Sequence, residues 1–471
     1  MAIERKRIKG SPQQQVKSNV NDPYKDIKKA IWAYFLLLIF EGALRKWFLP
    51  ALATPLLIVR DPIAAWVVFQ AYQKNLLTGN IYVRAINLIG VVGLITTMIF
   101  GHGNVIVALY GARTLFFHFP LMFVMGKVLT REDVLGLLKA TLWIAIPMVV
   151  LTTLQFYSPQ NAWVNRGVGG NEAGAGFSGA QGFFRPPGTF SFTNGNTMFF
   201  SLVASIIFYF WLVPENVNKW LLYGATFALL LSIPLSISRS LFFQTMVAVV
   251  FTLLAASRKP KFAGKIIGVA VGLVVVLLLL SQTEAFQIAT GAFLQRFTVA
   301  NEAEGGLEGV LIDRYLGGMV GALGRSGSFP LFGSGLGMGT NVGSQLLSGQ
   351  VTFLLAEGEW GREVAELGPI LGIILVIVRI SMSLKVAYES YLKLAKGDVL
   401  PWLLLSFSLM LIAQGSWGQP TSLGFAVLMG GLSLASVNAS AGEKKANYNE
   451  KPVRGYQNKY TSMRYKLSKN T

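Results

Sequence analysis

Apolar segments about as long as a membrane-spanning helix recur along almost the whole chain. A helix that crosses the hydrocarbon core of a bilayer needs roughly 20 mostly apolar residues. We expect about twelve spans, near residues 31–49, 55–72, 82–100, 105–127, 134–156, 194–213, 218–234, 238–256, 264–281, 367–386, 399–415 and 419–437. Because backbone groups in lipid must be paired within the chain, these segments predict an all-α, polytopic transmembrane helical bundle.

The composition agrees with lipid as the solvent of this chain. Of 471 residues, 53% are hydrophobic and 13% are charged, whereas soluble domains carry about 25% charged residues. There is no cysteine and there are two histidines, which excludes disulfides, thiolate metal sites and cysteine nucleophiles and argues against a multi-histidine metal site. We therefore expect neither a metal nor a cofactor.

The net charge of +19 is concentrated towards the two ends of the chain. Basic residues crowd both ends: Arg5, Lys6, Arg7, Lys9, Lys17, Lys25, Lys28 and Lys29 at the start, and Lys444, Lys445, Lys451, Arg454, Lys459, Arg464, Lys466 and Lys469 at the end. Basic segments beside membrane spans act as topology signals and contact anionic headgroups, so we expect membrane lipid rather than nucleic acid as their partner. No small-residue cleavage site follows the first apolar run, so we expect no signal peptide.

Lysines and arginines in the short loops predict the orientation of the spans. An even number of spans places both basic ends on one side, and the basic loop near residues 258–265 then falls on that side too. We expect a multi-pass protein of the cytoplasmic (inner) membrane with both termini cytoplasmic. It would comprise a basic arm at 1–30, a transmembrane bundle at 31–437 and a basic tail at 438–471.

Two long segments then lie at the outer face, near residues 157–193 and 282–366. Loops longer than about 15 residues are usually functional or disordered. Both segments carry aromatic and aliphatic residues among their glycines. We therefore expect ordered outer loops that contain short helices.

Arginine stands out at the predicted outer side. The arginines there are Arg166, Arg185, Arg239, Arg296, Arg314, Arg325 and Arg362. Arg239 differs from the others because it sits at the mouth of an apolar span, where a charge usually marks a site, with snorkelling to the headgroups as the alternative. Several arginines that converge in one cavity would suit a pyrophosphate, because a guanidinium binds phosphate oxygens bidentately.

A second constellation combines carboxylates with arginine in EGEWGREVAELG, residues 357–368. On a helix Glu359, Arg362, Glu363 and Glu366 share one face, because they are three or four residues apart. A carboxylate held near an arginine could accept a proton from a sugar hydroxyl. The alternative is an amphipathic helix at the membrane surface whose charges pair locally, and the sequence leaves both open.

Three further features favour structural roles. The glycine run LFGSGLGMGTN, residues 331–341, allows close backbone approach to a phosphate or sugar, but a plain turn is the favoured interpretation. His118 lies within a predicted span, where hydrogen-bonded packing is more common than catalysis. The pairs Glu41–Arg45 and Arg60–Asp61 are charges inside spans and are spaced for local pairing.

The chain has no Asp-x-Asp motif that could hold a nucleotide-sugar through a metal. This argues against a nucleotide-sugar donor. A donor whose leaving group is a lipid pyrophosphate needs less help, because preorganised arginines can stabilise the charge that develops on it.

Four stretches resemble, in their order, motifs of the O-antigen ligase/O-antigen polymerase superfamily of bacterial inner-membrane glycosyltransferases. RPPGTFSFTNGNTMFF resembles the Arg-x-x-Gly-Thr-Phe segment of that family, and SISRS resembles its Ser-Arg at the outer end of a helix. LFGSGLGMG resembles its glycine run, and EGEWGREVAELGPILG resembles its Glu-rich segment. The resemblance covers roughly residues 30–437 at the level of layout.

The resemblance implies a polymerase in O-antigen, exopolysaccharide or capsule biosynthesis. It would move glycan from an undecaprenyl-pyrophosphate-linked donor to a hydroxyl of a lipid-linked acceptor, without nucleotide or metal. A chain-length regulator and a flippase of the same pathway are then candidate partners.

The resemblance also implies roles for individual residues. Carried over by position, Arg185, Arg239 and Arg314 would hold the pyrophosphate. Arg166 and Arg362 are further candidates for binding pyrophosphate or glycan. The candidate catalytic residues are Glu357, Glu359 and Arg239, and either glutamate would engage the acceptor hydroxyl.

Three other functions remain open. Ligases of the family carry a histidine in the large outer loop, and residues 282–366 contain none, which favours a polymerase over a ligase. A transporter or flippase of lipid-linked sugar would favour internal repeats and broken, charged helices near the midplane, and the sequence shows no repeat. A non-catalytic scaffold of an export complex is the third.

Overall fold

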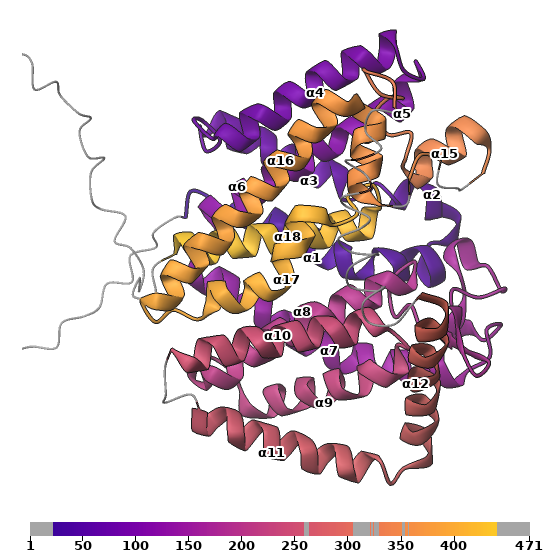
Figure 1. Cartoon of the computed structure of the whole chain (residues 1–471), viewed down its shortest axis with the longest axis vertical. Coiled ribbons are helices and arrows are strands. Elements are labelled where there is room, and N and C mark those ends of the chain that lie inside the picture. The colour runs from indigo at the N-terminus through magenta and orange to yellow at the C-terminus, as the bar shows by residue number, and fades with distance from the viewer. Residues whose placement is uncertain are drawn as a thin grey trace, which may run out of the picture. The chain divides into compact units, whose positions relative to one another are not determined.

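The computed structural model describes residues 22–258, 263–304, 321, 324, 329–350, 354–356 and 358–439. Helices dominate, and the one sheet among these residues has two strands, so the prediction of an α-helical protein is confirmed. Residues 26–441 form one compact unit, in which long helices lie side by side (Figure 1). The predicted basic arms fall mainly on 1–21 and 440–471, outside the described residues.

The elements follow one another in a simple order. The α-helices are α1 (Lys25–Ala43), α2 (Ala53–Leu56), α3 (Asp61–Gln73), α4 (Ile81–Ile99), α5 (Val105–Arg113), α6 (Phe119–Val128), α7 (Arg131–Tyr157), α8 (Thr193–Leu212), α9 (Lys219–Leu235), α10 (Arg239–Ser257), α11 (Ala263–Leu280), α12 (Glu284–Glu304), α15 (Asn341–Ser348), α16 (Glu359–Ala395), α17 (Leu400–Gln414) and α18 (Pro420–Asn438). Short π-helices are η1 (Leu44–Phe48) and η3 (Thr114–His118), and short 3-10 helices are η2 (Pro50–Leu52), η4 (Trp163–Asn165), η5 (Val168–Gly170) and η6 (Pro214–Asn216). The strands are β1 (Phe177–Ala180) and β2 (Phe183–Arg185).

A helix covers each of the predicted spans, but not every helix has the length and composition of a membrane span. Eight helices among the described residues are long and apolar enough to cross a bilayer, or nine if the bent pair α11–α12 counts as one. Helices α9 and α17 have 17 and 15 residues, which at about 1.5 Å per residue falls short of a hydrocarbon core about 30 Å thick. The protein is therefore helical with several candidate spans, and the count of twelve stays a prediction.

Helix α18 lies at the centre of the bundle, and nearly all of its residues are buried. It packs against α6, α17 and α8. Small residues allow the closest approach: a Cβ at Gly430 or Gly431 would meet the side chains of Met122 or Met125 on α6. Helix association in lipid depends on such small residues, because no hydrophobic effect drives one apolar helix onto another.

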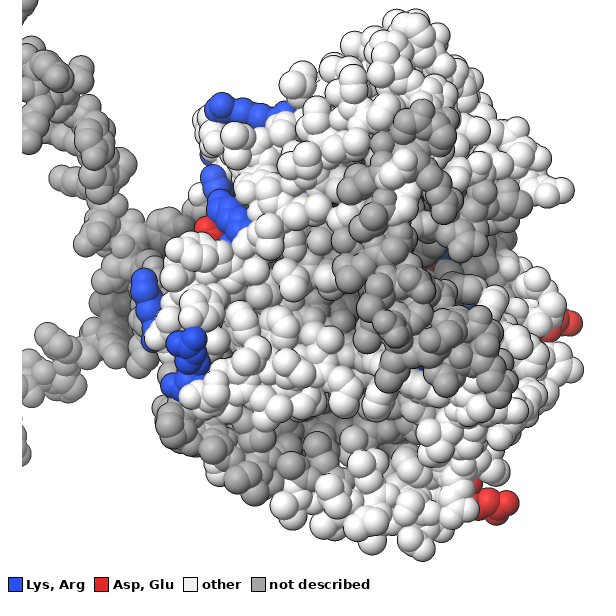
Figure 2. Space-filling model, viewed as in Figure 1, with Lys and Arg blue, Asp and Glu red and all other residues white. Residues whose placement is uncertain are grey.

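Charge is distributed unequally between the two ends of the bundle. Figure 2 shows the largest patches of Lys and Arg along one end, with one acidic patch among them, and further acidic side chains at the opposite end. Exposed basic residues lie at the C-terminal ends of three helices: Lys127 in the last turn of α6, Arg258 directly after α10 and Lys396 directly after α16. The same pattern that predicted the orientation from sequence is thus present on the folded surface.

The first long loop runs between α7 and α8, as predicted, but its regular structure is only partly helical. Besides η4 and η5 it contains the antiparallel hairpin β1–β2. Buried polar contacts fix the end of this loop: Gln155 holds both the N–H and the carbonyl of Gly188, at 2.7 and 3.1 Å, and the Lys46 ammonium donates to that carbonyl at 2.7 Å. The Thr189 hydroxyl donates to the carbonyl of Ile39 on α1 at 2.6 Å.

Helix α1 meets this loop at Gly42. A Cβ at Gly42 would overlap the backbone of residues 189–191, whereas a Cβ at Gly136 on α7 would make only an ordinary contact, 3.6 Å from Trp32. We expect Gly42→Ala to lower the thermal unfolding temperature in detergent, because the loop must move away from α1. Gly136→Ala should raise it or leave it unchanged, since alanine is favoured over glycine in a helix by about 1 kcal/mol. Equal unfolding temperatures for Gly42→Ala and the wild type would contradict this packing.

Candidate functional site

The hairpin β1–β2 carries Arg185 at its end. Its two-residue turn, Gln181–Gly182, has positive φ at both positions, as tight hairpins require. Phe183 stacks on Phe156 at the end of α7, with ring centroids 4.5 Å apart. The hairpin is therefore held against α7, and the side chain of Arg185 is half-buried.

Arg239 begins α10 directly after a tight turn. Ile237 has φ +47°, a strained conformation for a β-branched residue. The Ser238 side chain caps α10 by accepting from the N–H of Leu241 at 3.4 Å and also contacts the Thr197 hydroxyl at 3.1 Å. Ile237 lies against Gly179 of the hairpin, so the same turn that presents Arg239 also packs on the strand that precedes Arg185.

Arg296 reaches the same region from α12. Helix α12 turns through 105° from α11 and passes the ends of α9 and α10 (Figure 1). Phe293 and Phe297 flank Arg296 and pack on Phe242 of α10, with ring centroids 6.0 and 5.8 Å away. Apolar contacts therefore bring Arg296, which is half-buried, beside the start of α10.

Three arginines from separate segments thus form one cluster, which we call the arginine cluster: Arg185, Arg239 and Arg296. Burial lowers the pKa of the Arg185 guanidinium, and the nearby positive charges of Arg296 and Arg239 lower it further. The Nε of Arg185 is buried with no hydrogen-bond partner in the described part of the chain. Like charges held this close favour a bound anion, because an anion stabilises each charged form.

The other predicted arginines of the site do not all join this cluster. Arg166 pairs with the exposed carboxylate of Glu172 at 3.2 Å. Arg314, the third residue expected to hold the pyrophosphate, lies outside the described residues, and so does the candidate base Glu357. Arg362 belongs to a different cluster at the start of α16.

The acidic constellation forms a buried ion-pair network, which we call the α16 network: Glu359, Arg362, Glu363, Glu366 and Arg379. Arg362 donates to Glu359 at 2.7 and 3.1 Å and to Glu366 at 2.6 Å. Arg379, which is 0% exposed, donates to Glu359 at 3.3 Å and also to Glu363. The charges pair locally, as one of the two alternatives has it, but the carboxylates are buried rather than at the membrane surface.

The backbone places this network inside the protein. Helix α16 is broken at Gly368, whose φ of +79° and ψ of 168° are not helical, and Pro369 follows. The first segment, residues 359–367, can thus fold its charges back towards Arg379 on the second. Since both oxygens of Glu359 accept from arginines, this geometry favours the structural alternative for Glu359.

The glycine run after residue 330 packs on this network. The N–H of Gly339 donates to Glu366 at 2.8 Å, and the N–H of Gly335 donates to the backbone carbonyl of Glu366 at 2.9 Å. The N–H of Leu336 donates to the Thr97 hydroxyl at 2.9 Å, and the carbonyl oxygen of Leu336 lies 3.0 Å from Nε2 of His102. The run forms turns, as predicted, with the N–H of Gly333 donating to the carbonyl of Pro330 and the N–H of Thr340 to that of Gly337. The anion that it contacts is the Glu366 carboxylate.

A cavity of about 20 Å³ lies between the run and the network. Glu363 lines it and has one buried oxygen without a partner in the described part of the chain. This volume is enough for one water molecule. A single water donating to Glu363 would complete the network.

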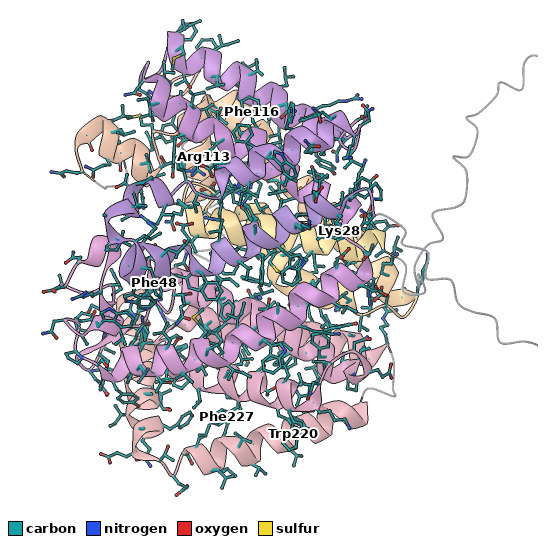
Figure 3. The ribbon with its side chains drawn as sticks, turned by 180° about the vertical axis from the view of Figure 1, so that it is seen from behind. Lys28, Phe48, Arg113, Phe116, Trp220 and Phe227 are labelled. Atoms are coloured by element: carbon teal, nitrogen blue, oxygen red, sulfur yellow. The ribbon has the colours of Figure 1, made fainter. Side chains whose placement is uncertain are left out.

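A second buried network joins the first helices. His118 contacts the Tyr34 hydroxyl at 3.0 Å and Asp61 at 2.8 Å, and Asp61 also accepts from Arg113 at 2.8 Å. Figure 3 shows Arg113 inside the bundle, among packed helices. His118 is 1% exposed, so the expectation that it packs through hydrogen bonds is confirmed.

The four charges expected to pair with their sequence neighbours do so only in part. Glu41 pairs with Arg45 at 3.4 Å, as predicted. Arg60 pairs with Glu41 at 3.1 Å instead of with Asp61, because α3 turns Asp61 towards Arg113.

Sequence reasoning missed three buried cations: Arg379, Lys46 and Arg113, which pairs with Asp61. Arg379 lies in the middle of a predicted span, and a lone arginine in an apolar segment was a signal that it has a buried partner. Lys46 is 1% exposed and reaches the Gly188 carbonyl, a role that only the fold of the first loop reveals. Among the described residues, no group of three or more His, Asp or Glu side chains could hold a metal ion.

Neither protein-family models nor curated proteins match this sequence. The resemblance to the O-antigen ligase/polymerase superfamily therefore rests on the four short motifs. Two of these motifs contain Arg185 and Arg239, which meet in the arginine cluster. The other two meet in the contact between Gly339 and Glu366.

The α16 network generates a test of stability. We expect Arg379→Met to lower the free energy of unfolding by about 3–5 kcal/mol, because it leaves buried carboxylates without a partner. Arg379→Met combined with Glu363→Gln should recover part of that loss, since one uncompensated charge is removed. Thermal unfolding in detergent measures both, and a double variant no more stable than Arg379→Met would argue against direct pairing.

Proposed function

We propose that this protein is a polysaccharide polymerase at the outer face of the cytoplasmic membrane. It transfers glycan from an undecaprenyl-pyrophosphate-linked donor to a hydroxyl of a lipid-linked acceptor. The observation that carries the proposal is the convergence of Arg185, Arg239 and Arg296. Support also comes from the order of the four motifs and from the helices that are apolar enough to cross a membrane.

The arginine cluster would hold the pyrophosphate of the donor. The reaction breaks the bond between the sugar and the pyrophosphate oxygen and forms a bond to the acceptor oxygen, so negative charge grows on the departing lipid pyrophosphate. Preorganised guanidinium groups stabilise that charge as it develops. This role needs no nucleotide, because the leaving group and its charge belong to the lipid donor.

The acceptor side of the reaction is assigned to the segment before α16. The acceptor hydroxyl loses its proton as the new bond forms, and Glu357 is the proposed acceptor of that proton. Glu359 takes a positioning role in this proposal, since Arg362 and Arg379 occupy both of its oxygens. The α16 network then fixes the start of the helix that follows Glu357.

The orientation of the protein follows from its basic surface. With the end that carries Lys127, Arg258 and Lys396 in the cytoplasm, the turn before Arg239 lies at the outer face, because α10 runs from Arg239 to Ser257. Both termini are then cytoplasmic, in line with the positive-inside rule.

A transporter of lipid-linked oligosaccharide is the second candidate. The break in α16 at Gly368, next to buried charges, is a feature of transporters with discontinuous helices. A polymerase does not move its substrate across the membrane, so it does not need such a break. Reconstituted protein that flips the lipid without extending its glycan would favour the transporter.

The activity can be measured with purified protein and a synthetic undecaprenyl-pyrophosphate oligosaccharide, without nucleotide or metal. We expect a ladder of longer glycans on a gel. Arg239→Lys should reduce its formation roughly 10²-fold, because a point charge does not replace a bidentate donor. Arg258→Lys, at the other end of α10, is the matched control and should keep full activity. An active Arg239→Lys variant would refute the pyrophosphate role of this residue.

The chain contains no cysteine, so single cysteines can report its topology. Glu172 in the first loop has a side chain that is 75% exposed, and Lys396 is exposed at the other end of the bundle. We expect a membrane-impermeant maleimide to label Glu172→Cys in intact spheroplasts and Lys396→Cys only after permeabilisation. The reverse pattern would show that the proposed orientation is wrong.

A further inference from the structure

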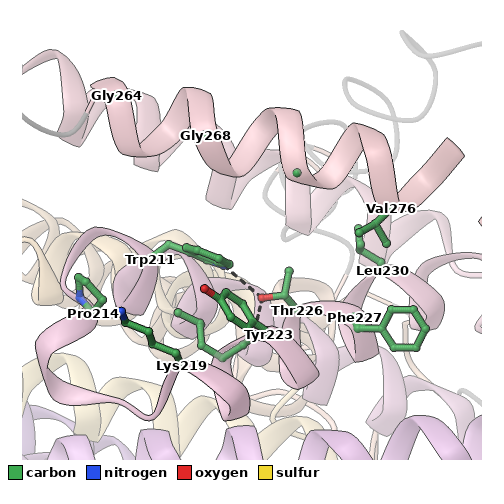
Figure 4. A pocket seen from close by; sticks show the side chains of 12 residues that line it. Trp211, Pro214, Lys219, Tyr223, Thr226, Phe227, Leu230, Gly264, Gly268 and Val276 are labelled. Carbon is green, nitrogen blue, oxygen red and sulfur yellow. Dashed lines mark hydrogen bonds between the residues drawn. The ribbon is translucent and has the colours of Figure 1, made fainter. Parts of the chain in front are cut away.

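An apolar groove of about 620 Å³ lies between α9 and α11 (Figure 4). Its volume is within the range of roughly 300–1,000 Å³ that is typical of pockets for small molecules. Tyr223, Phe227 and Leu230 of α9 form one wall, and α11 forms the other. The end of α8 closes one side with Trp211, whose ring is 5.6 Å from that of Tyr223.

Two of the polar side chains that line the groove, Trp211 and Thr226, are already hydrogen-bonded within the protein. The Trp211 indole N–H donates to the Thr226 hydroxyl at 3.1 Å, and that hydroxyl donates to the Leu222 carbonyl at 2.7 Å. A sugar or a peptide backbone would find few partners here, and burying its polar groups would be costly. The chemistry of the wall therefore fits a hydrocarbon chain.

Three glycines shape the wall that α11 contributes. Gly264, Gly268 and Gly272 are spaced by four residues, so they lie along one face of the helix. A Cβ at any of them would meet nothing within 4 Å. In lipid such a face usually lets another helix pack closely, but here it borders the groove and makes it wide enough for a chain.

The groove opens beside a basic and aromatic end. Lys219 begins α9 and lines the groove, and Trp220 next to it is 81% exposed. Lysine and tryptophan are the residue types that meet lipid headgroups at a membrane interface. The 17 residues of α9 separate Lys219 from the turn before Arg239, which corresponds to about 25 Å, so this end belongs to the other leaflet than the arginine cluster.

We propose that the groove between α9 and α11 binds one acyl chain of an anionic phospholipid. The chain lies along Gly264, Gly268 and Gly272, and the headgroup rests by Lys219. The distance from the arginine cluster distinguishes this site from that of the proposed donor. The proposal does not depend on the proposed polymerase activity, because the bound phospholipid would lie in the leaflet opposite to the arginine cluster.

The first test fills the groove. Full-length protein, freed of lipid in detergent, is titrated with dioleoylphosphatidylglycerol, and bound lipid is counted by native mass spectrometry. Gly268→Leu should weaken binding about tenfold for every two methylene groups that it displaces. The matched control is Leu277→Trp, which adds bulk to the same helix two and a half turns away, on its opposite side. Leu277 is 40% exposed, and its variant should bind as the wild type does.

The second test addresses the headgroup. Lys219→Gln should remove the preference for phosphatidylglycerol over phosphatidylcholine while leaving binding of phosphatidylcholine unchanged, since only the charge is lost. Thermal unfolding of each variant, without lipid, establishes that the fold is intact. Gly268→Leu should unfold at the temperature of the wild type or above it, because its side chain enters open space and leucine is favoured over glycine in a helix.

Several outcomes would overturn the proposal. Binding of phosphatidylglycerol by Gly268→Leu with wild-type affinity would exclude the groove as the site, and an unchanged preference in Lys219→Gln would exclude the headgroup assignment. A wild-type dimer that Gly268→Leu converts to a monomer would show that a helix of a second copy fills the groove. Displacement of phosphatidylglycerol by undecaprenyl phosphate at equal concentration would assign the groove to the polyprenyl donor instead.

Discussion

The cost of burying charge in an apolar bundle is the constraint on which this structure depends. An ion that leaves water loses several kcal/mol of solvation, and only a well-placed opposite charge recovers it. Arg379 shows the result: Glu359 and Glu363 contact it from the preceding segment, the carbonyls of Ile412 and Gly415 accept from it, and the ring of Trp417 lies 3.8 Å away. One arginine thus ties the start of α16, the middle of α16 and the end of α17 together.

The arginine cluster, in contrast, brings three charges of the same sign into one region. Its members share the same sign, and what holds them together is packing: the stacked Phe156 and Phe183, the contact of Ile237 with the hairpin, and the phenylalanines of α12. These packing contacts oppose the repulsion between the like charges. A ligand with several negative oxygens would relieve that repulsion, so the site is organised before its ligand arrives.

Sequence reasoning could predict the positions of the helices because the signal is long and unmistakable. Some twenty apolar residues in lipid have no stable conformation other than a helix, so even the segment interrupted by Arg60 and Asp61 forms one. The same reasoning predicted that Arg185 and Arg239 would lie in one region, and they do. It could not predict that Arg60 contacts Glu41 rather than its neighbour Asp61, because several partners lay within reach of each charge.

The remaining differences also come from contacts between distant segments. The hairpin in the first loop depends on its packing against α7 and Ile237, and residues 177–185, which form it, encode neither contact on their own. The role of Arg296 depends on the bend that brings α12 to α10. Sequence spacing describes one element at a time, whereas these features require several elements to meet.

The bend between α11 and α12 also limits how a ligand can approach. If α11 crosses the bilayer, an angle of 105° leaves α12 running nearly along the membrane surface. Arg296 then lies on a helix that runs nearly parallel to the membrane surface, with Phe293 and Phe297 packed against α10. A ligand of the arginine cluster would then have to approach beside this helix, either from the water or from within the bilayer.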